Sequence, residues 1–263
     1  MTDRHYHTFL SRYVECEVLR SFLMELLEVV DKAVKEPVFR CDWAEMILLQ
    51  NSVLVKVLQQ CSRIISDRLL DPFVEEVWSK IFHTSINFIS QPSLQLETFS
   101  RSKRNKILSR YKDMRRETAL GVKGLWFSLG INKIRFVAGR ECRGSLVGPF
   151  LMMTMLPDTE LRKATIPIFF DMMQCEFYHT RHRMKENEVP KIKQLENEML
   201  EKLDHLVEKG HGDEHYRDMF KTLIGSLCQG HATLCDTGRR LVSTVTHLLD
   251  RLLQYRTHHE HTG

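Results

Sequence analysis

Apolar side chains recur along most of the chain at spacings of three and four residues, which places them on one face of an α-helix. The first stripe predicts a helix from about Tyr6 to Val34, and Pro37 ends it because the residue before a proline disfavours helical backbone angles. The same spacing predicts helices at about 42–70, 72–90, 93–99, 100–129, 150–156, 159–178, 188–209, 213–229 and 236–256. No convincing two-residue alternation typical of a β-strand interrupts them.

Residues suited to helix ends support several of these boundaries. Asp71 and Asp158 precede helical stripes and can accept hydrogen bonds from the free N–H groups of a first turn. Pro72 suits the first position of a helix, because its missing N–H has no partner there anyway. Gly130 follows a helix, where a left-handed residue is common, and Pro167 predicts a kink or a restart.

Two expectations concern the packing of these helices. The apolar side of the helix at 42–70 is expected to consist of Met46, Leu49, Val53, Val57, Ile64 and Ile65. Gly121 and Gly124 weaken their helix, so we expect them to mark a close approach of a second helix.

The predicted fold class is all-α, with about nine or ten helices in a stacked array of degenerate repeats. Only 12 glycines and 7 prolines occur in 263 residues, which is few for a many-stranded sandwich or barrel. The stretch 131–149 is the one irregular connection, and the tail 257–263 is expected to fray because it has nothing to pack against. We therefore expect one helical region over residues 1–256.

Composition places the chain among folded proteins. Hydrophobic residues make up 43% and charged residues 27%, which excludes a disordered or low-complexity chain. The polar start does not resemble a secretory signal, and no apolar run approaches the roughly 18 residues of a membrane span. The seven cysteines are scattered and odd in number, so we expect reduced thiols in a cytoplasmic protein.

Positive charge is concentrated between residues 101 and 116, which contain eight basic residues and one acidic residue, Asp113. The net charge of the whole chain is only +4. Such a segment can attract an anionic phosphoinositide membrane or a partner protein. Alternatively, it is a solvated helix face whose charges meet acids elsewhere. Nucleic acid is not expected, because no recognition motif accompanies the charge. The candidate face consists of Lys103, Arg104, Lys106, Arg110, Lys112, Arg115 and Arg116.

The sequence contains few patterns that are typical of catalytic or metal-binding sites. The sequence lacks a glycine-rich phosphate loop, a GxSxG elbow, an HExxH helix and an EF-hand spacing. The HGDEH run at 211–215 holds potential zinc ligands, but Asp213 more naturally caps a helix there. Cys228, His231 and Cys235 lack a nearby fourth ligand and are more typical of a buried thiol and a turn histidine. We expect no metal and no cofactor.

Other chemistry-bearing residues have structural interpretations. Asp171 follows an apolar run without a nearby catalytic partner, so a paired structural acid is the favoured interpretation. The methionine groups 152–155 and 172–173 are more typical of core filling than of an adaptable contact surface.

Residues 159–177, TELRKATIPIFFDMMQCEF, closely resemble a stretch of the dedicator-of-cytokinesis (DOCK) family, in the branch that partners ELMO adaptors. Further matches lie in the same order along the chain: QNSV at 50–53, SLQLETFS at 93–100, YKDMRR at 111–116, WFSLG at 126–130, KLDH at 202–205, GDEHY at 212–216 and LQYRT at 253–257. The resemblance covers most of the chain.

The resemblance implies an armadillo/HEAT-like helical region just before the catalytic DOCKER domain of an exchange factor for Rac/Cdc42-type GTPases. None of the family's catalytic residues has a counterpart, so we expect a non-catalytic scaffold that positions lipid-binding and catalytic domains. A Rac-type GTPase would bind only through the catalytic domain, while ELMO or a second copy could bind the helices. The expected location is the cytoplasm, with recruitment to the plasma membrane.

Two segments depart from the family pattern. The stretches 138–146 and 183–194 look expanded, and both fall in loops or at helix starts where insertions are tolerated. They affect the expected helix boundaries but not the resemblance itself.

Overall fold

The computed structural model describes residues 5, 8, 9, 12, 15–36, 38–137, 145–183 and 192–262. Within these ranges every regular element is an α-helix or a short 3-10 helix, which confirms the all-α prediction. The contacts divide the chain into two compact units, residues 1–129 and 130–263. No helix of the described ranges is long and apolar enough to cross a bilayer.

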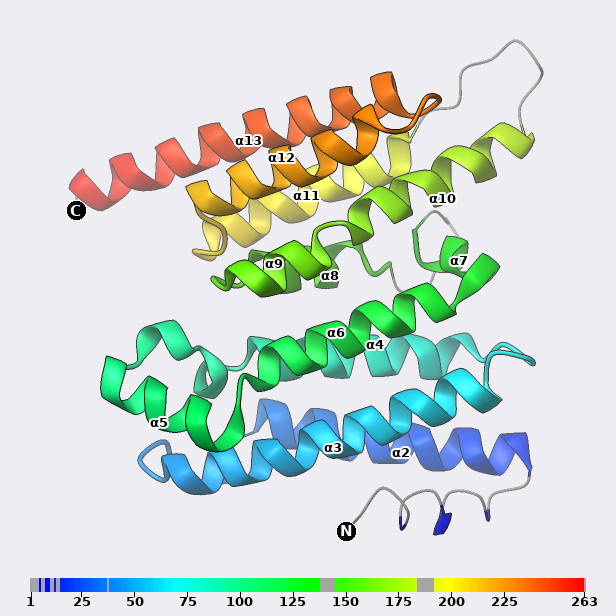
Figure 1. The fold of residues 1–263 in the computed structure, drawn as a ribbon, viewed down its shortest axis with the longest axis vertical. Coiled ribbons are helices and arrows are strands. Elements are labelled where there is room, and N and C mark those ends of the chain that lie inside the picture. Colours follow the sequence, from blue (N-terminus) through cyan, green and yellow to red (C-terminus); the bar gives the residue numbers. More distant parts are fainter. Residues whose placement is uncertain are drawn as a thin grey trace. The chain divides into compact units, whose positions relative to one another are not determined.

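The first unit is built around α4. Fully buried aromatic side chains fill it: Trp78, Phe82 and Phe88 of α4 and Trp126 of α6. Helix α4 packs against α2, α3 and α6, and α3 packs along α6 (Figure 1). The elements are α2 (Cys16–Lys35), α3 (Ala44–Arg68), α4 (Glu75–Ser90), η1 (Pro92–Leu94), η2 (Leu96–Thr98), α5 (Arg101–Tyr111) and α6 (Met114–Ser128).

The second unit is built from helices packed side by side, of which α13 is the longest. Helix α13 packs against α11 and α12, and α11 packs against α8 (Figure 1). Phe150, Phe169, Tyr216 and Phe220 are buried between these helices. The elements are η3 (Gly130–Lys133), α7 (Ile134–Val137), α8 (Val147–Met155), α9 (Thr159–Thr165), α10 (Ile168–Arg183), α11 (Lys193–Glu208), α12 (Glu214–Gln229) and α13 (Cys235–Thr262).

The helix predicted at 100–129 is two helices, α5 and α6. Lys112 lies between them with φ 60°, a left-handed conformation that ends α5. Asp113 then starts α6, because its side chain accepts a hydrogen bond from the N–H of Arg115. The apolar stripe continues across this break, which is why the periodicity predicted one helix.

Other boundaries also differ from the sequence prediction. Helix α4 begins at Glu75, so Asp71 and Pro72 lie in the preceding turn and not in its first helical turn. The predicted helix at 93–99 is two short 3-10 turns, and α13 continues to Thr262 beyond the expected end at Arg256. The beginning of the predicted first helix, Pro37 and most of the two expanded stretches lie outside the described residues.

Helix α3 carries apolar residues on more than one face, and its predicted packed side is correct at Ile65, which is fully buried, but wrong in the first half of the helix. Leu48 and Leu58 face the unit interior, whereas Met46, Leu49 and Val53 are 41–50% exposed. Apolar residues at three- and four-residue spacing occur on both faces, so the pattern alone could not distinguish them.

The close-approach glycine is also not where the sequence predicted it. A Cβ added to Gly121 or Gly124 would meet nothing within 4 Å, so no helix packs closely there. At Gly238 in α13 the same Cβ would lie 2.3 Å from Sγ of Cys228 in α12. The missing side chain of Gly238 therefore allows α12 and α13 to pack together.

Candidate functional site

The predicted basic face lies on α5 and the start of α6, but its members are not equivalent. Most are exposed, Arg104 is half-buried, and the side chain of Arg115 is only 1% exposed. Burial removes Arg115 from any surface that a membrane or partner could contact, so its assignment to the face is corrected. The exposed members are Lys103, Lys106, Arg110, Lys112 and Arg116.

Part of the remaining charge is neutralised within the unit. Glu45 at the start of α3 accepts from Nζ of Lys106 at 2.7 Å and from Nη1 of Arg110 at 3.0 Å. The hydrogen bond from Lys106 lowers the pKa of Glu45 below its ordinary value. Arg116 lies 3.7 Å from Asp113. Two cations share the one carboxylate of Glu45, so this part of the face keeps a net positive charge.

Lys103 has a different environment. Its ammonium lies 4.1 Å from the ring centroid of Phe99, within the range of a cation–π interaction. In the described ranges no carboxylate lies within ion-pair distance of Lys103 or Arg104. Lys112 likewise has no carboxylate within ion-pair distance in the described ranges, so Lys103, Arg104 and Lys112 are the members of the face with charge still available.

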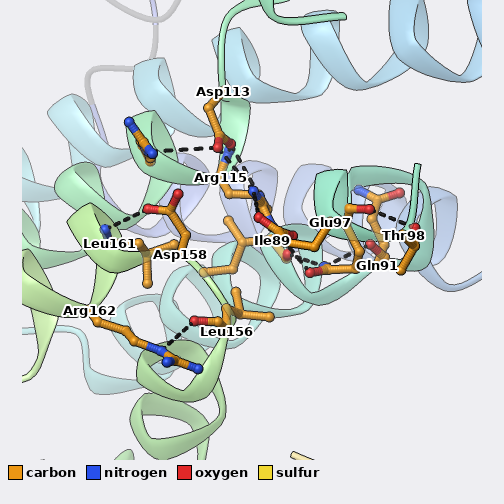
Figure 2. A network of polar contacts seen from close by, with 12 residues as sticks. Ile89, Gln91, Glu97, Thr98, Asp113, Arg115, Leu156, Asp158, Leu161 and Arg162 are labelled. Atoms are coloured by element: carbon orange, nitrogen blue, oxygen red, sulfur yellow. Dashed lines mark hydrogen bonds and ion pairs between the residues drawn. The ribbon is translucent and has the colours of Figure 1, made fainter. Parts of the chain in front are cut away.

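Arg115 instead holds the α5–α6 junction together. Its guanidinium donates to both oxygens of Glu97 at 2.7 and 3.0 Å, and to both oxygens of Asp113 at 3.2 and 3.0 Å. A further donation reaches Oε1 of Gln95 at 3.3 Å, so the network joins α6 to η2 (Figure 2). Burial alone would lower the pKa of Arg115, but these carboxylates outweigh it and raise the pKa.

Arg162 is the corresponding buried arginine of the second unit, with its side chain 2% exposed. It donates to the carbonyl oxygens of Leu156 and Met155 at 2.8 and 2.9 Å, at the C-terminal end of α8 (Figure 2). It also donates to both carboxylate oxygens of Asp213 at 2.8 and 2.7 Å. Its guanidinium carbon lies 5.6 Å from the ring centroid of Tyr216, so one side chain joins α8, α9 and α12.

The HGDEH run at 211–215 lies at this junction. Asp213 caps α12 by accepting from the N–H of Tyr216 at 2.7 Å, which confirms the predicted cap. Nε2 of His215 lies 3.3 Å from Oγ1 of Thr159, and Arg256 donates to the carbonyl oxygen of Gly212 at 3.0 Å. In the described parts of the chain no group of three His, Cys, Asp or Glu residues could hold a metal ion.

Cys228, His231 and Cys235 each have a separate structural environment. Cys228 is buried against Gly238, and burial raises the pKa of its thiol to about 11. His231 pairs with the hydroxyl of Tyr178 at 3.2 Å. Sγ of Cys235 accepts from Arg239 at 3.2 Å. The buried-thiol and turn-histidine interpretation is the one that the contacts support.

The remaining candidates are also structural. Asp171 pairs with Nζ of Lys133 at 2.9 Å, which confirms the paired-acid interpretation. Met153, Met155, Met172 and Met173 are buried, as the core interpretation predicted, whereas Met152 is half-buried. The predicted cap Asp158 accepts from the N–H of Leu161 at 2.8 Å and starts α9 (Figure 2).

Two buried carboxylates escaped the sequence analysis. Asp31 in α2 accepts from Asn87 of α4 at 2.9 Å and from Lys35 at 2.6 Å. Burial alone would raise the pKa of Asp31, but these hydrogen bonds outweigh it and lower the pKa. Asp31 is followed four residues later by Lys35, a spacing that signals a helical ion pair but not the link to α4.

Glu176 in α10 caps a helix that it does not belong to. Its carboxylate oxygens accept from the N–H groups of Gln194 and Leu195 at 2.9 and 2.8 Å, at the start of α11. Burial raises the pKa of Glu176 even though the two hydrogen bonds act in the opposite direction. No local spacing in the sequence signals this contact, because the partners are 18 and 19 residues away.

Within each unit, helices packed side by side define an all-helical protein of the repeat-array type. The model of the dedicator of cytokinesis (DOCK) TPR region matches residues 1–223 of the chain. The chain is 35% identical over 257 residues to human dedicator of cytokinesis protein 4, and 36% identical over 266 residues to human dedicator of cytokinesis protein 3. The chain therefore belongs to the dedicator of cytokinesis family.

The match covers 97% of this chain but only 12% of each human relative. The chain thus spans about an eighth of the length of the relatives it matches. The family description calls this region TPR, a helical repeat, which agrees with the all-α fold and assigns it to a named part of the family.

Proposed function

We propose that this chain is a non-catalytic helical scaffold segment of a guanine-nucleotide exchange factor for Rac-type GTPases, holding lipid-binding and catalytic domains in a fixed relation. Family membership supports the parent activity, and the expected position is before the DOCKER domain. The GTPase would bind the catalytic domain and not this segment. The protein would work in the cytoplasm, with recruitment to the plasma membrane.

One observation carries the scaffold role. The charged side chains buried in the described ranges are Asp31, Arg115, Asp158, Arg162 and Glu176, and the hydrogen bonds of each end on another helix, a helix terminus or a helix junction. Breaking such a buried contact costs several kcal/mol, typically about 3–5 for an ion pair. Each unit therefore resists bending between its own helices, which a spacer between domains requires.

The scaffold role is tested in the longer protein that contains this segment. Arg115→Met with Arg162→Met should reduce nucleotide exchange on Rac at vesicles, where domain placement matters, and leave exchange in solution unchanged. Equal exchange at vesicles would contradict the scaffold role. The isolated 263-residue chain should not accelerate nucleotide release from Rac, and a clear acceleration would overturn the non-catalytic assignment.

A second candidate function is binding to an anionic membrane through α5. The observation in its favour is that Lys103 and Arg104 have no carboxylate within ion-pair distance in the described ranges. It predicts binding to phosphatidylserine vesicles that weakens with salt, since exposed charges are screened over about 8 Å at physiological ionic strength. Lys103→Glu with Arg104→Glu should abolish it, and unchanged binding would remove α5 from consideration.

Partner proteins are a separate part of the proposal. We propose that an ELMO adaptor or a second copy of the chain binds the exposed apolar side chains of α3, which include Met46, Leu49 and Val53. Replacing Leu49 and Val53 by Ser should weaken co-purification with ELMO or shift the chain to a monomer in sedimentation. No change in either measurement would contradict it.

A further inference from the structure

A cleft runs between α3 and α5 in the first unit. Its larger part is a cavity of about 520 Å³, lined mostly by apolar side chains such as Val38, Ile47 and Phe99. A second cavity of about 240 Å³ continues it toward Tyr111. Both are lined by Ala44, Leu48, Lys103 and Ile107, so the two cavities are adjacent, and together they are here named the α3–α5 cleft. Its size and apolar lining are typical of a ligand-binding site.

Basic side chains are distributed along the cleft. Lys35 lines the larger cavity, Lys103 lines both cavities, and Lys106 and Arg110 line the smaller one. Among the lining residues, Glu45 is the acid that partly offsets them, and it already binds both Lys106 and Arg110. The cleft therefore combines an apolar floor with a net positive rim.

Lys103 is the best placed of these cations. Its ammonium is held 4.1 Å from the centroid of Phe99, which itself lines the larger cavity. Within the described residues its charge has no carboxylate partner, so an incoming carboxylate would not have to displace one. A carboxylate can form a charge-assisted hydrogen bond with the ammonium of Lys103, which makes Lys103 an effective anchor.

Exposed apolar side chains lie at the edge of the cleft and beside it. Val38 is 69% exposed, and Trp43, which stacks on Phe39 with ring centroids 6.3 Å apart, is 53% exposed. Met46 on the next turn of α3 is 41% exposed. A group of apolar side chains beside a cavity marks an interaction site more often than isolated exposed residues do.

We propose that the α3–α5 cleft binds an acidic amphipathic segment of a partner protein. One apolar side chain of that segment would fill the larger cavity, and its carboxylates would pair with Lys103 and with Lys106 or Arg110. A fatty acid fits less well, because it carries one charge whereas the cations extend over both cavities. The proposal does not depend on the scaffold role, since a rigid spacer needs no occupant here.

The test uses a fluorescein-labelled helical peptide with Leu and Phe on one face and Glu on the other. We expect it to bind the 263-residue chain, more weakly at high salt, and to shift the fluorescence of Trp43. The matched peptide with Lys in place of Glu should not bind. Of the three tryptophans, Trp78 and Trp126 are fully buried, so Trp43 is the accessible reporter.

Two substitutions locate the binding site. Lys103→Glu should weaken binding about tenfold or more, because it replaces an attraction by a repulsion. Its control is Arg101→Glu, which makes the same charge change on the same helix at a residue that lines neither cavity. Val38→Asp should also weaken binding, whereas Val29→Asp, at a 65% exposed valine of α2 outside the cleft, should not.

Several outcomes would overturn the proposal. The acidic peptide could bind equally well to the Lys103→Glu and Val38→Asp variants, or the lysine peptide could bind as tightly. Dodecanoate could bind in place of the peptide, which would make the cleft a fatty-acid site. Phosphatidylserine vesicles could bind through Lys103 while the peptide does not, which would make it a membrane site. Unchanged far-UV circular dichroism of each variant excludes unfolding as the cause.

Discussion

Arg115 in the first unit and Arg162 in the second are both almost completely buried, and both bind an aspartate that caps a helix. Asp113 caps α6, the helix of Arg115 itself, whereas Asp213 caps α12, a neighbour of the helix of Arg162. Arg115 lies two residues after Asp113 in the sequence and also binds a second carboxylate, that of Glu97, which lies 18 residues away. Arg162 lies 51 residues from Asp213 along the chain, and its guanidinium also donates hydrogen bonds to two backbone carbonyl oxygens. The first arrangement stabilises a helix break, and the second joins three helices.

The difference predicts different consequences of losing the cation. Without Arg115, two carboxylates would remain side by side, and the side chain of Asp113 is only 9% exposed. Without Arg162, one carboxylate would remain, and Asp213 is 43% exposed and can be solvated. The first unit should therefore suffer more from an uncompensated charge, and the second from unpaired carbonyl groups.

The largest effect is expected for Arg115→Met. It should reduce the free energy of unfolding of the first unit by about 3–5 kcal/mol, as for other buried ion pairs that lose one partner. All three tryptophans lie in this unit, so tryptophan fluorescence during urea denaturation measures it directly.

Arg116→Met is the control for that variant. Arg116 is exposed on the same helix and lies 3.7 Å from Asp113, so its loss should cost about 1 kcal/mol or less. Equal shifts of the two urea midpoints would show that the buried network contributes no more than an exposed ion pair.

Arg162→Met should reduce stability by about 2–4 kcal/mol. It leaves the carbonyl oxygens of Met155 and Leu156 without their donor, at about 1–3 kcal/mol for each unsatisfied group. The second unit contains no tryptophan, so far-UV circular dichroism is the measurement. Lys163→Met, at an exposed neighbour on α9, should change little, and a comparable loss there would contradict the role of Arg162.

The local sequence predicted the helix caps of the second unit, but not the buried arginine and the helix break of the first unit. The caps Asp158 and Asp213 and the restart at Pro167 follow from residue types and positions within one turn of a helix. The burial of Arg115 and the break at Lys112 do not, because the residues around them look like one continuous basic helix. Which arginine is buried depends on Glu97, and a window of local periodicity does not connect the two.

The candidate site shows the same limit. Sequence identified the segment that carries Lys103, Lys106 and Arg110, because charge density is a local property. It could not identify the α3–α5 cleft, since that feature requires Leu48 of α3 to lie opposite Ile107 of α5. It also selected the wrong packed side for the first half of α3, at Met46, Leu49 and Val53, because apolar residues lie on both sides of the helix there.

A third prediction extends the comparison from arginines to helix caps. Glu176→Ala should cost the second unit about 1–2 kcal/mol, because the N–H groups of Gln194 and Leu195 lose their acceptor. Glu176→Gln should cost less, since the amide oxygen can still accept and no charge is buried. Thermal melting by circular dichroism distinguishes the two, and equal losses would assign the effect to packing.

The smallest effect is a pH dependence of the second unit that arises from Asp213. Burial alone would raise the pKa of Asp213, but the hydrogen bonds from Arg162 and from the N–H of Tyr216 outweigh it and lower the pKa. A lowered pKa in the folded state gives stability that is present above the ordinary value of 3.8 and is lost as the pH falls through the folded value. With Asp213 43% exposed, solvent screening limits the effect to about 0.5–1 kcal/mol.

Asp213→Asn isolates that contribution, because asparagine still caps a helix but does not ionise in this range. The stability difference between the unchanged chain and Asp213→Asn should be largest near neutral pH and should shrink below pH 3.8, as followed by urea denaturation and circular dichroism. In an Arg162→Met background the same difference should be small at every pH, since the cation that lowers the pKa is gone. A difference that stays constant with pH would show that Asp213 acts as a neutral cap, and that Arg162 stabilises the junction through the α8 carbonyls alone.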